Sequence, residues 1–418
     1  MIERLGVVSG HVSCDPLVTM DSLSGKTSGL KSLLISSNYY PPDVGGISQY
    51  MSSMVSALGP DRVCCLTGVR AQVDQQKKRP AAGVYRRPLA FAKPKYIQAV
   101  GWAAAVAEIV VRERPHAVQL ATLYEGPFGL WMRKWMRMPY VVYAHGNEVL
   151  DAIRSDWDGL RRAIRNADCV LANSHFTAGL LKQVGVESER IEIVHPGCDV
   201  ARFQPTAVSN DVRKAILGRH AQGKIILTVG RLVPRKGHDV MIRALPRVLK
   251  DIPDACYLIV GSGPAKPMLE ELTFSMGVHG NVIFLENVGD AELPSIYGMC
   301  DVFVMPSRAD LKACDVEGFG IVYLEANACG KPVIAGRSGG IADAVVDGET
   351  GLLVPPDSPE TLAESVCQLL THKEYAERLG QQGRERAIRD FSWDAIADHV
   401  DRIMIAVASG KYGPVSNS

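Results

Sequence analysis

Short apolar segments alternate with longer helical segments along the chain from residue 31 onward. The first series of strand-like segments consists of SLLIS, RVCCL, HAVQL, PYVVYA, DCVLA and IEIVH. After the polar stretch 201–223, the series restarts with KIILTVG, CYLIVG, NVIFL, DVFVM and PVIAG. Alternation of this kind predicts parallel, doubly wound sheets. The sequence therefore predicts an α/β protein in which two Rossmann-like domains face each other across a central cleft.

The same pattern gives the domain boundaries. We expect an N-terminal domain over residues 31–205 and a C-terminal domain over residues 222–392, joined by a weakly structured linker. Residues 1–30 are rich in Ser, Gly and Thr and precede the first convincing strand, so we expect a loose N-terminal arm. A misassigned start codon would explain the same segment. In open sheets the ligand binds beyond the carboxyl ends of the strands, which predicts a site in the cleft.

The overall composition excludes several classes of protein. With 46 basic and 45 acidic residues, the chain has no global field that would attract nucleic acid. The ten cysteines include no CxxC pair, so they suggest neither a disulfide framework nor a zinc site, and a reducing cytoplasm fits best. Residues 1–30 lack the apolar run of a signal peptide. The segment VGWAAAVAEIVV is short and interrupted by Glu108, so we expect no membrane span.

Glu317 and Glu325 lie eight residues apart around a glycine-rich turn that follows the strand DVFVM. We expect a helix to begin at Gly318, with its free amides and its dipole facing an anion such as a phosphate. Glu325 then lies about two turns along this helix, close to the face that Glu317 begins. Ionised carboxylates accept hydrogen bonds from sugar and ribose hydroxyls, each worth roughly 1.5–3 kcal/mol. The alternative is an amphipathic helix with two solvated glutamates, which the apolar run IVYLEANACG disfavours. The predicted donor-binding residues of this segment are Glu317, Gly318, Phe319, Gly320, Ile321 and Glu325.

Two basic residues, Arg231 and Lys236, follow the strand KIILTVG and are separated by a turn that contains proline. We expect both to point into the cleft toward a diphosphate. Fixed cations in a dry cleft stabilise the negative charge that develops on such a leaving group. We assign Arg235 of the same turn to solvent. A solvated basic loop is the alternative for the whole turn.

Several motifs in this order resemble the retaining glycosyltransferases of family 4, which have the GT-B fold. The motifs are PPDVGG at 41–46, HGNE at 145–148, GRLVPRKG at 230–237, IVGSGP at 259–264, the two glutamates with GFG, and GGIAD at 339–343. The resemblance extends from about residue 31 to the C-terminus. The runs VGRLVPRKGHD and DVEGFGIVYLEANACG look most like the phosphatidylinositol mannoside mannosyltransferases, which use GDP-mannose. This closer match concerns the donor half and says little about the acceptor.

The resemblance implies roles for residues that the local sequence leaves open. A lone histidine after a strand is more often structural, but within HGNE the family places His145 beside the transferred sugar. Gly45 and Gly46 would let the backbone approach the donor phosphates from the first domain, with a simple turn as the alternative. Contacts around Val288 decide the choice of nucleotide. The amphipathic segment 393–410 is expected to cross back and pack on the first domain.

The family also implies that transfer retains the anomeric configuration. The sequence offers no distinct nucleophile, so we favour front-face attack, in which the leaving phosphate takes the acceptor proton while His145 and Glu317 hold the sugar. Double displacement is the alternative. The residues predicted to take part in catalysis are His145, Arg231, Lys236 and Glu317.

We expect no cofactor and no metal ion, because Arg231, Lys236 and the helix start at Gly318 supply the positive charge that a metal would bring. Asp156-Trp157-Asp158 matches a DxD metal motif of another transferase fold. It lies in the helical stretch LDAIRSDWDGLRRAI rather than directly after a strand. We therefore interpret this match as coincidental.

A basic segment at 77–95 has a possible membrane role. It holds Lys77, Lys78, Arg79, Arg86, Arg87, Lys93 and Lys95, with Tyr85, Phe91 and the following Tyr96 interleaved. Each basic residue near an anionic lipid surface contributes about 1 kcal/mol, so the segment could hold the protein reversibly at a membrane. An exposed basic loop is the alternative.

These observations favour a cytoplasmic glycosyltransferase, peripheral on the inner face of the membrane, that moves a hexose to a lipid-linked or glycan acceptor. Mannose from GDP-mannose is the favoured donor. A transferase that uses UDP-sugars or other nucleotide sugars for exopolysaccharide or lipopolysaccharide is the alternative. A sugar-nucleotide epimerase and a non-catalytic binding protein fit less well. A dehydrogenase is disfavoured because the chain has no GxGxxG fingerprint, and 261–264 reads GSGP.

Overall fold

The structure, a computed structural model, describes residues 30–41, 43, 45–68, 83–87, 95–154 and 157–412. The side chains of residues 95–99 are not described. The expected loose arm lies outside the described residues except for its last position, Leu30.

The N-terminal domain is built on a sheet of seven parallel strands in the order β3-β2-β1-β4-β5-β6-β7. The strands are β1 (Ser32–Ser36), β2 (Val63–Gly68), β3 (Val84–Arg87), β4 (Ala117–Leu120), β5 (Tyr140–Ala144), β6 (Cys169–Ala172) and β7 (Ile191–Ile193). Central β1 pairs Ser32 with Val63 on one side and with Ala117 on the other. All five residues of β1 are buried, as expected for a parallel strand that is covered on both faces.

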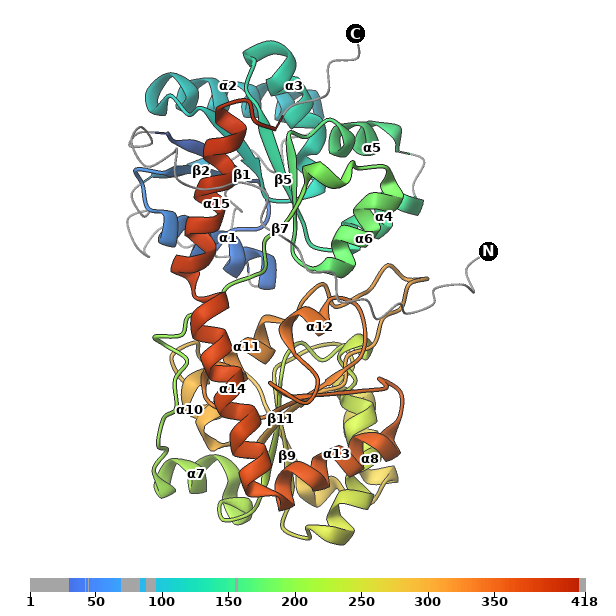
Figure 1. Ribbon diagram of the computed structural model, residues 1–418. Helices are drawn as coiled ribbons and strands as arrows, with labels where there is room; N and C mark the ends of the chain where they lie inside the picture. Colours follow the sequence, from blue (N-terminus) through green and yellow to red (C-terminus); the bar gives the residue numbers. More distant parts are fainter. Residues whose placement is uncertain are drawn as a thin grey trace.

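Helices cover both faces of this sheet (Figure 1). They are α1 (Gly46–Leu58), α2 (Lys95–Glu113), α3 (Gly126–Met136), α4 (Asn147–Arg154), α5 (Asp158–Arg165) and α6 (His175–Val184). Successive side chains of a strand point to opposite faces. Leu33 and Ile35 therefore join one apolar cluster, and Leu34 joins the other.

The C-terminal domain repeats this plan with six parallel strands in the order β10-β9-β8-β11-β12-β13. The strands are β8 (Ile225–Val229), β9 (Cys256–Val260), β10 (Val282–Leu285), β11 (Val302–Met305), β12 (Val333–Gly336) and β13 (Leu352–Val354). The helices of this half are α7 (Asn210–Leu217), α8 (His238–Asp251), α9 (Lys266–Ser275), α10 (Leu293–Met299), α11 (Ile321–Ala328), α12 (Ile341–Ala344), α13 (Pro359–Thr371) and α14 (Lys373–Phe391). Ile225 and Leu227 face one cluster and Ile226 the other. The predicted pair of Rossmann-like domains is confirmed.

The stretch 201–223 is more structured than the sequence suggested, because it contains α7. Ser209 caps this helix by accepting a hydrogen bond from the amide of Val212. Arg213 anchors it through hydrogen bonds to the backbone oxygens of Ala221, at 2.9 Å, and Met299, at 2.7 Å. Only Leu217 of the helix is buried, so the segment has no apolar periodicity that would reveal it.

The last helix, α15 (Trp393–Ala408), leaves the C-terminal domain and packs on α1 of the N-terminal domain (Figure 1). Ile396, Val400, Ile403 and Val407 are buried in the same apolar cluster as Tyr50. The chain thus crosses between the domains twice, and the two crossings lie side by side where Cys198 donates from its amide to the oxygen of Phe391, at 2.7 Å.

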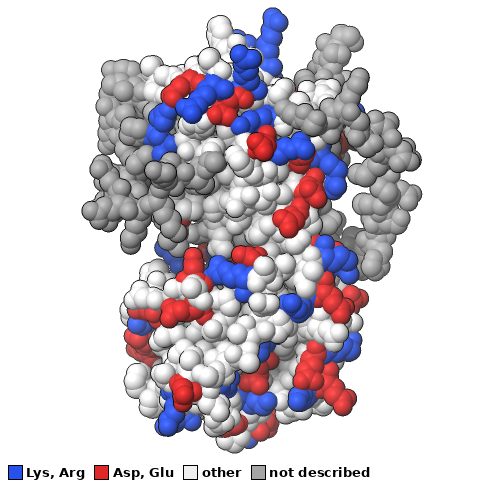
Figure 2. Space-filling view, turned by 90° about the vertical axis from the view of Figure 1, so that its left-hand side faces the viewer, with Lys and Arg blue, Asp and Glu red and all other residues white. Residues whose placement is uncertain are grey.

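The described helices include none that is both long enough and apolar enough to cross a bilayer. Lys and Arg side chains alternate with Asp and Glu over the face of the C-terminal domain shown in Figure 2, where no single sign of charge dominates. Such a mixed surface agrees with the near-neutral net charge of +1.

Candidate functional site

A cavity of about 850 Å³ lies between the two domains, beyond the carboxyl ends of strands from both sheets. The predicted site residues that line it are Gly45, Gly46, His145, Arg231, Lys236, Glu317, Gly318, Phe319, Gly320 and Ile321. Segments as far apart in sequence as 45–46 and 317–321 therefore meet in one site. Glu325 and Val288 are not among the lining residues.

Glu317 is held by two cations from the turn that follows β8. Its Oε2 accepts from Lys236 Nζ at 2.5 Å and from Arg235 Nη1 at 2.6 Å. Arg235 also pairs with Asp315, with 2.7 Å between Nε and Oδ1. The assignment of Arg235 to solvent is therefore wrong. Its side chain is only 18% exposed, because the short 3-10 turn Pro234–Lys236 directs both cations toward the acidic segment before α11.

These charges set the ionisation of the site. Burial alone would raise the pKa of Glu317, but Lys236 and Arg235 outweigh burial and lower it below its usual value. Glu317 is therefore ionised at neutral pH. Three cations, Arg231, Arg235 and Lys236, and two carboxylates, Glu148 and Glu317, line the cavity, which leaves one net positive charge in its lining. A diphosphate would be attracted to this lining.

Glycines allow the backbone around the cationic turn 234–236 to pack closely against neighbouring segments. Gly237 has φ of 73°, and a Cβ atom there would lie 2.3 Å from the backbone oxygen of Pro306. Gly261 and Gly263 pack equally closely on the GRL segment, since their Cβ atoms would lie 2.1 Å from the oxygen of Gly230 and 2.4 Å from that of Leu232. The glycines of GSGP therefore bring two loops together at the site.

Helix α11 begins three residues later than the sequence suggested. Gly320 precedes it with φ of 93°, a left-handed conformation that few other residues adopt, and the helix starts at Ile321. Glu317 consequently lies in the loop before the helix, so the eight-residue spacing does not place it on a helical face with Glu325. The free amides at the helix start are those of Ile321 and Val322, and both residues line the cavity.

Glu325 is buried inside the C-terminal domain. It is 6% exposed, its Oε2 accepts from the hydroxyl of Tyr297 at 2.7 Å, and burial raises its pKa. It lies one turn beyond Ile321, on the same face of α11. Val288 packs against the apolar cluster of the same domain. The donor-binding roles of Glu325 and Val288 stay predictions.

His145 stands at the end of β5 on the opposite wall of the cavity. Its Nε2 lies 2.9 Å from the backbone oxygen of Ala121. A carbonyl only accepts, so Nε2 carries a proton, and in the neutral form of the ring Nδ1 is then an acceptor. The ring of Tyr50 packs edge-on at 5.8 Å, and the carboxylate of Glu148 accepts from the His145 amide at 2.7 Å. These contacts fix the ring and its tautomer.

The HGNE loop touches the segment before α11 directly. A Cβ atom on Gly318 would lie 2.1 Å from the backbone oxygen of His145, so only glycine allows this approach. The amide of Val316 donates to Oδ1 of Asn147 across the domain boundary, at 2.9 Å. The two predicted motifs therefore form one continuous site.

Gly45 and Gly46 open onto the cavity at the start of α1. No heavy atom lies within 4 Å of a Cβ atom built on either residue. The φ of Gly45 is 155°, which other residues rarely adopt. The approach of this backbone to donor phosphates stays a prediction.

Sequence reasoning did not single out several residues of the cavity. They are Ile47, Tyr50, Asn147, Glu148, Asn173, Pro196, Ser262, Gly263, Val316 and Val322. Asn147 and Glu148 belong to the HGNE motif, and Ser262 and Gly263 to IVGSGP, so the motifs pointed to these positions without naming each residue. Asn173 follows β6, and its side-chain amide donates to the backbone oxygen of His145 at 3.1 Å, a contact that no local pattern indicates.

The two described residues of the DxD match, Trp157 and Asp158, do not line the cavity. Trp157 precedes α5, Asp158 is its first residue, and Asp156 lies outside the described residues. Among the described residues, the one group of His, Cys, Asp and Glu spaced to hold a metal ion is His175, His195 and Asp343. None of the three lines the cavity.

Two facing parallel-sheet domains with a cationic cavity between them are the arrangement of GT-B glycosyltransferases. Residues 44–202 match the family described as Glycosyltransferase Family 4, and residues 210–386 match Glycosyl transferases group 1. The chain belongs to the family 4 glycosyltransferases.

Relatives with assigned activities cover most of the chain. It is 32% identical over 371 residues to the GDP-mannose-dependent alpha-(1-6)-phosphatidylinositol monomannoside mannosyltransferase of Mycolicibacterium smegmatis, covering 86% of this chain and 95% of that protein. The enzyme described in the same words from Mycobacterium tuberculosis H37Rv is 32% identical, covering 87% and 96%. A GDP-mannose-dependent enzyme for the monoacylated lipid, from Corynebacterium glutamicum, is 30% identical, covering 90% and 98%.

Solved structures share the fold. HepE of Anabaena in complex with UDP superposes with a TM-score of 0.76 at 21% identity, covering 90% of this chain and all of that one. Sucrose-phosphate synthase of Thermosynechococcus elongatus gives a TM-score of 0.74 at 24% identity, covering 91% and 100%. The GT-B fold expected from the motifs is confirmed.

Proposed function

We propose that this glycosyltransferase moves mannose from GDP-mannose, with retention of configuration, to a lipid-linked or glycan acceptor. The observation that carries the proposal is the cavity in which Glu317, held by Lys236 and Arg235, shares one site with His145 of the other domain. The choice of GDP-mannose is supported by relatives at 30–32% identity that are described as GDP-mannose-dependent mannosyltransferases.

The diphosphate would lie against the cationic wall. Arg231 and Lys236 line the cavity together with Ile321 and Val322, the first residues of α11. Cations and free amides stabilise the charge that develops on the departing diphosphate, and losing one such contact typically costs about 10²–10³ in rate. Within the described part of the chain Arg231 has no acidic partner, so its charge is available to a ligand.

The sugar would lie between the two domains. Nδ1 of His145 can accept a hydrogen bond from a sugar hydroxyl, because Nε2 is engaged by Ala121. The ionised Glu317 is a second acceptor. In front-face attack, the acceptor hydroxyl forms the new bond to the anomeric carbon on the side from which the diphosphate leaves. Its proton passes to the leaving phosphate oxygen, so no further base is required.

Metal independence is part of the proposal. The net positive charge at the cavity wall comes from arginine and lysine side chains, which supply the electrostatic stabilisation that a divalent cation gives in other transferases. Turnover should therefore survive dialysis against EDTA. Loss of turnover on dialysis, restored by a divalent cation, would contradict this part.

The acceptor and the membrane role rest on the relatives and on the basic segment. The relatives named above act on phosphatidylinositol mannosides. Most of the segment 77–95, including Lys77, Lys78 and Arg79, lies outside the described residues. Within the described part, Arg87 pairs with Glu108 at 2.5 Å and Arg86 lies over the ring of Tyr40.

A reversible hold on anionic lipid would place the enzyme at the cytoplasmic face of the membrane, where such lipids gather. Reversing Lys77, Lys78 and Arg79 to Glu should lower co-sedimentation with anionic vesicles and leave neutral vesicles unaffected. Unchanged sedimentation would refute the docking role.

The reaction itself is tested by product analysis. Purified protein is incubated with GDP-mannose or UDP-glucose and with extracted membrane lipids, and new products are identified by mass spectrometry and their anomeric configuration by NMR. A lipid bearing an added α-linked mannose from GDP-mannose is the expected result. Transfer from UDP-glucose alone would establish the alternative donor, and an epimerised nucleotide sugar without transfer would contradict the reaction class.

A further inference from the structure

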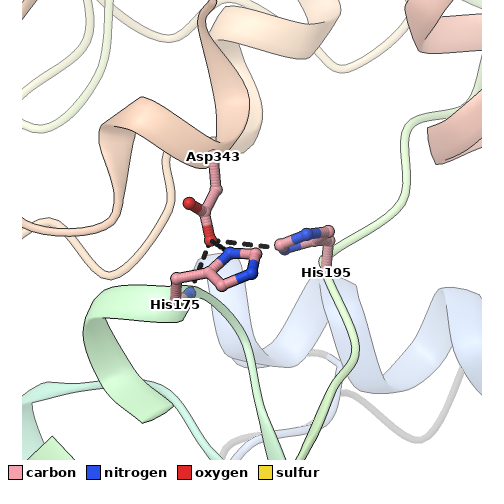
Figure 3. A group of neighbouring side chains, drawn as sticks. All are labelled: His175, His195 and Asp343. Carbon is pink, nitrogen blue, oxygen red and sulfur yellow. Dashed lines mark hydrogen bonds and ion pairs between the residues drawn. The ribbon is translucent and has the colours of Figure 1, made fainter. Parts of the chain in front are cut away.

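Three potential metal ligands meet at the boundary between the domains, outside the cavity. His175 is the first residue of α6, His195 follows β7, and Asp343 belongs to α12 of the C-terminal domain. Figure 3 shows the carboxylate of Asp343 pointing from its helix toward both imidazoles. Two ligands thus come from one domain and the third from the other.

The distances fit one ion. Nδ1 of His175 lies 3.0 Å from Oδ2 of Asp343, and Nδ1 of His195 lies 3.9 Å from the same oxygen. Two ligands at about 2.1 Å from a tetrahedral zinc ion lie about 3.4 Å apart, a value between the two separations found here. The three ligand atoms all lie within 4.8 Å of one another. His175 is 70% exposed on its side chain, so its ring has room to reorient around an ion.

The backbones that carry these residues are held together already. A Cβ atom on Gly340 would lie 1.9 Å from the oxygen of Gly318 and 2.5 Å from Oγ of Ser174. The start of α12 therefore packs directly on the start of α6. The same Oδ2 of Asp343 also accepts from the amide of His175, at 2.6 Å, so an ion bound there would share this oxygen with the amide, which a carboxylate oxygen with two lone pairs allows. Because these backbones are already packed together, metal binding would cost little further conformational entropy.

We infer that His175, His195 and Asp343 form a site for a divalent transition metal, of which Zn²⁺ is the type case, that links the two domains. Two imidazoles and one carboxylate are a ligand set that suits zinc rather than magnesium or calcium, which prefer oxygen. Water completes the coordination on the exposed side of His175. The site is separate from the proposed reaction, and a metal bound there tethers the domains beside the cavity, since His195 stacks on Phe319 at 5.3 Å.

Two neighbours would act against an ion at this position: the charge of Arg386, and the contact between His195 and Asn173. Arg386 donates to the backbone oxygens of Asp343, at 2.7 Å, and Ala344, at 2.9 Å, so its charge is partly engaged. Nδ1 of His195 lies 3.1 Å from the oxygen of Asn173, and metal binding replaces the proton between them. The spacing of cysteines, which suggests no zinc site, cannot reveal a site of this composition.

The experiment titrates the full-length protein with Co²⁺ and with Zn²⁺. Bound Co²⁺ should give the visible d–d absorption that is typical of low-symmetry coordination, and one equivalent of Zn²⁺ should displace the Co²⁺ and abolish this absorption. His195→Gln and Asp343→Asn should each weaken Zn²⁺ binding, followed by calorimetry, at least about tenfold, as loss of a ligand or its partner typically does. Asp343→Asn is close in shape and keeps an oxygen for the His175 amide, so it should fold.

The matched control is His372→Gln, which removes an exposed histidine at the end of α13 and should leave binding unchanged. A thiolate-to-cobalt charge-transfer band would move the metal to a cysteine and overturn the site. Zn²⁺ binding that is absent, or equal in Asp343→Asn and in the natural protein, would overturn it as well. None of these outcomes depends on the donor or the acceptor of the proposed reaction.

Discussion

Replacing Glu317 by Gln removes the charge at the centre of the cavity wall and keeps the shape of the side chain. Glu317 is 12% exposed and lies 2.5 Å from Lys236 and 2.6 Å from Arg235. Arg235 keeps its second partner, Asp315, so only Lys236 loses its carboxylate. We expect a loss of about 2–3 kcal/mol in the stability of the C-terminal domain, below the roughly 3–5 kcal/mol of a buried pair broken outright. For a domain of this size that corresponds to about 4–12 °C in Tm.

Turnover and nucleotide binding should respond differently to Glu317→Gln. Turnover of GDP-mannose should fall about 10²–10³-fold, because an acceptor for the sugar is lost in the transition state. GDP affinity should hold or rise, since the net charge of the cavity lining changes from +1 to +2 when one of two carboxylates opposing three cations is removed. Discontinuous assays of kcat measure the effect on turnover, and calorimetry with GDP measures the effect on affinity. Glu374→Gln, an exposed change at the start of α14, is the control. Wild-type turnover in Glu317→Gln at unchanged stability would refute this role of the carboxylate.

Three further predictions follow from single contacts. Lys236 and Arg235 lower the pKa of Glu317 in the folded state, so its contribution to stability is present above the unfolded pKa of about 4.3 and is lost as the pH falls through the folded pKa. The difference in Tm between wild type and Glu317→Gln should therefore be constant from about pH 6 to about pH 8 and shrink below about pH 4.5. Glu325→Ala should weaken GDP binding in calorimetry, because the carboxylate on α11 is predicted to bind the ribose, and unchanged affinity would remove it from the site. Gly340→Ala should lower Tm by the equivalent of about 1–3 kcal/mol, since its Cβ would lie 1.9 Å from the oxygen of Gly318; an unchanged Tm would show that this contact can relax.

The strands of the core could be predicted from the sequence because buried parallel strands are short and apolar. β3 and β13 escaped this pattern: β3 has one buried residue, Val84, and β13 has three residues in all. Edge strands such as these depend on a neighbour for their pairing, and a local pattern carries little of that information.

The site could be predicted as far as its motifs, but not in its geometry. The helix start at Ile321 depends on the left-handed backbone of Gly320, which the letters GFG do not specify. The partner of Arg235 lies 82 residues away in sequence, so solvent was the default assignment for its charge. The pairing of His175 with Asp343 spans 168 residues and two domains, and only the folded chain brings them together.

The central claim is that the cavity binds a guanosine diphosphate sugar, and the most direct measurement is thermal stabilisation by GDP, UDP and ADP and by their mannose and glucose conjugates. A ligand at one hundred times its Kd adds about 2.7 kcal/mol to stability, which a melting curve resolves easily. We predict that GDP and GDP-mannose raise Tm and that the uridine and adenosine compounds do not. Stabilisation by UDP alone would contradict the donor, and a Tm that no nucleotide changes would contradict the assignment of the cavity.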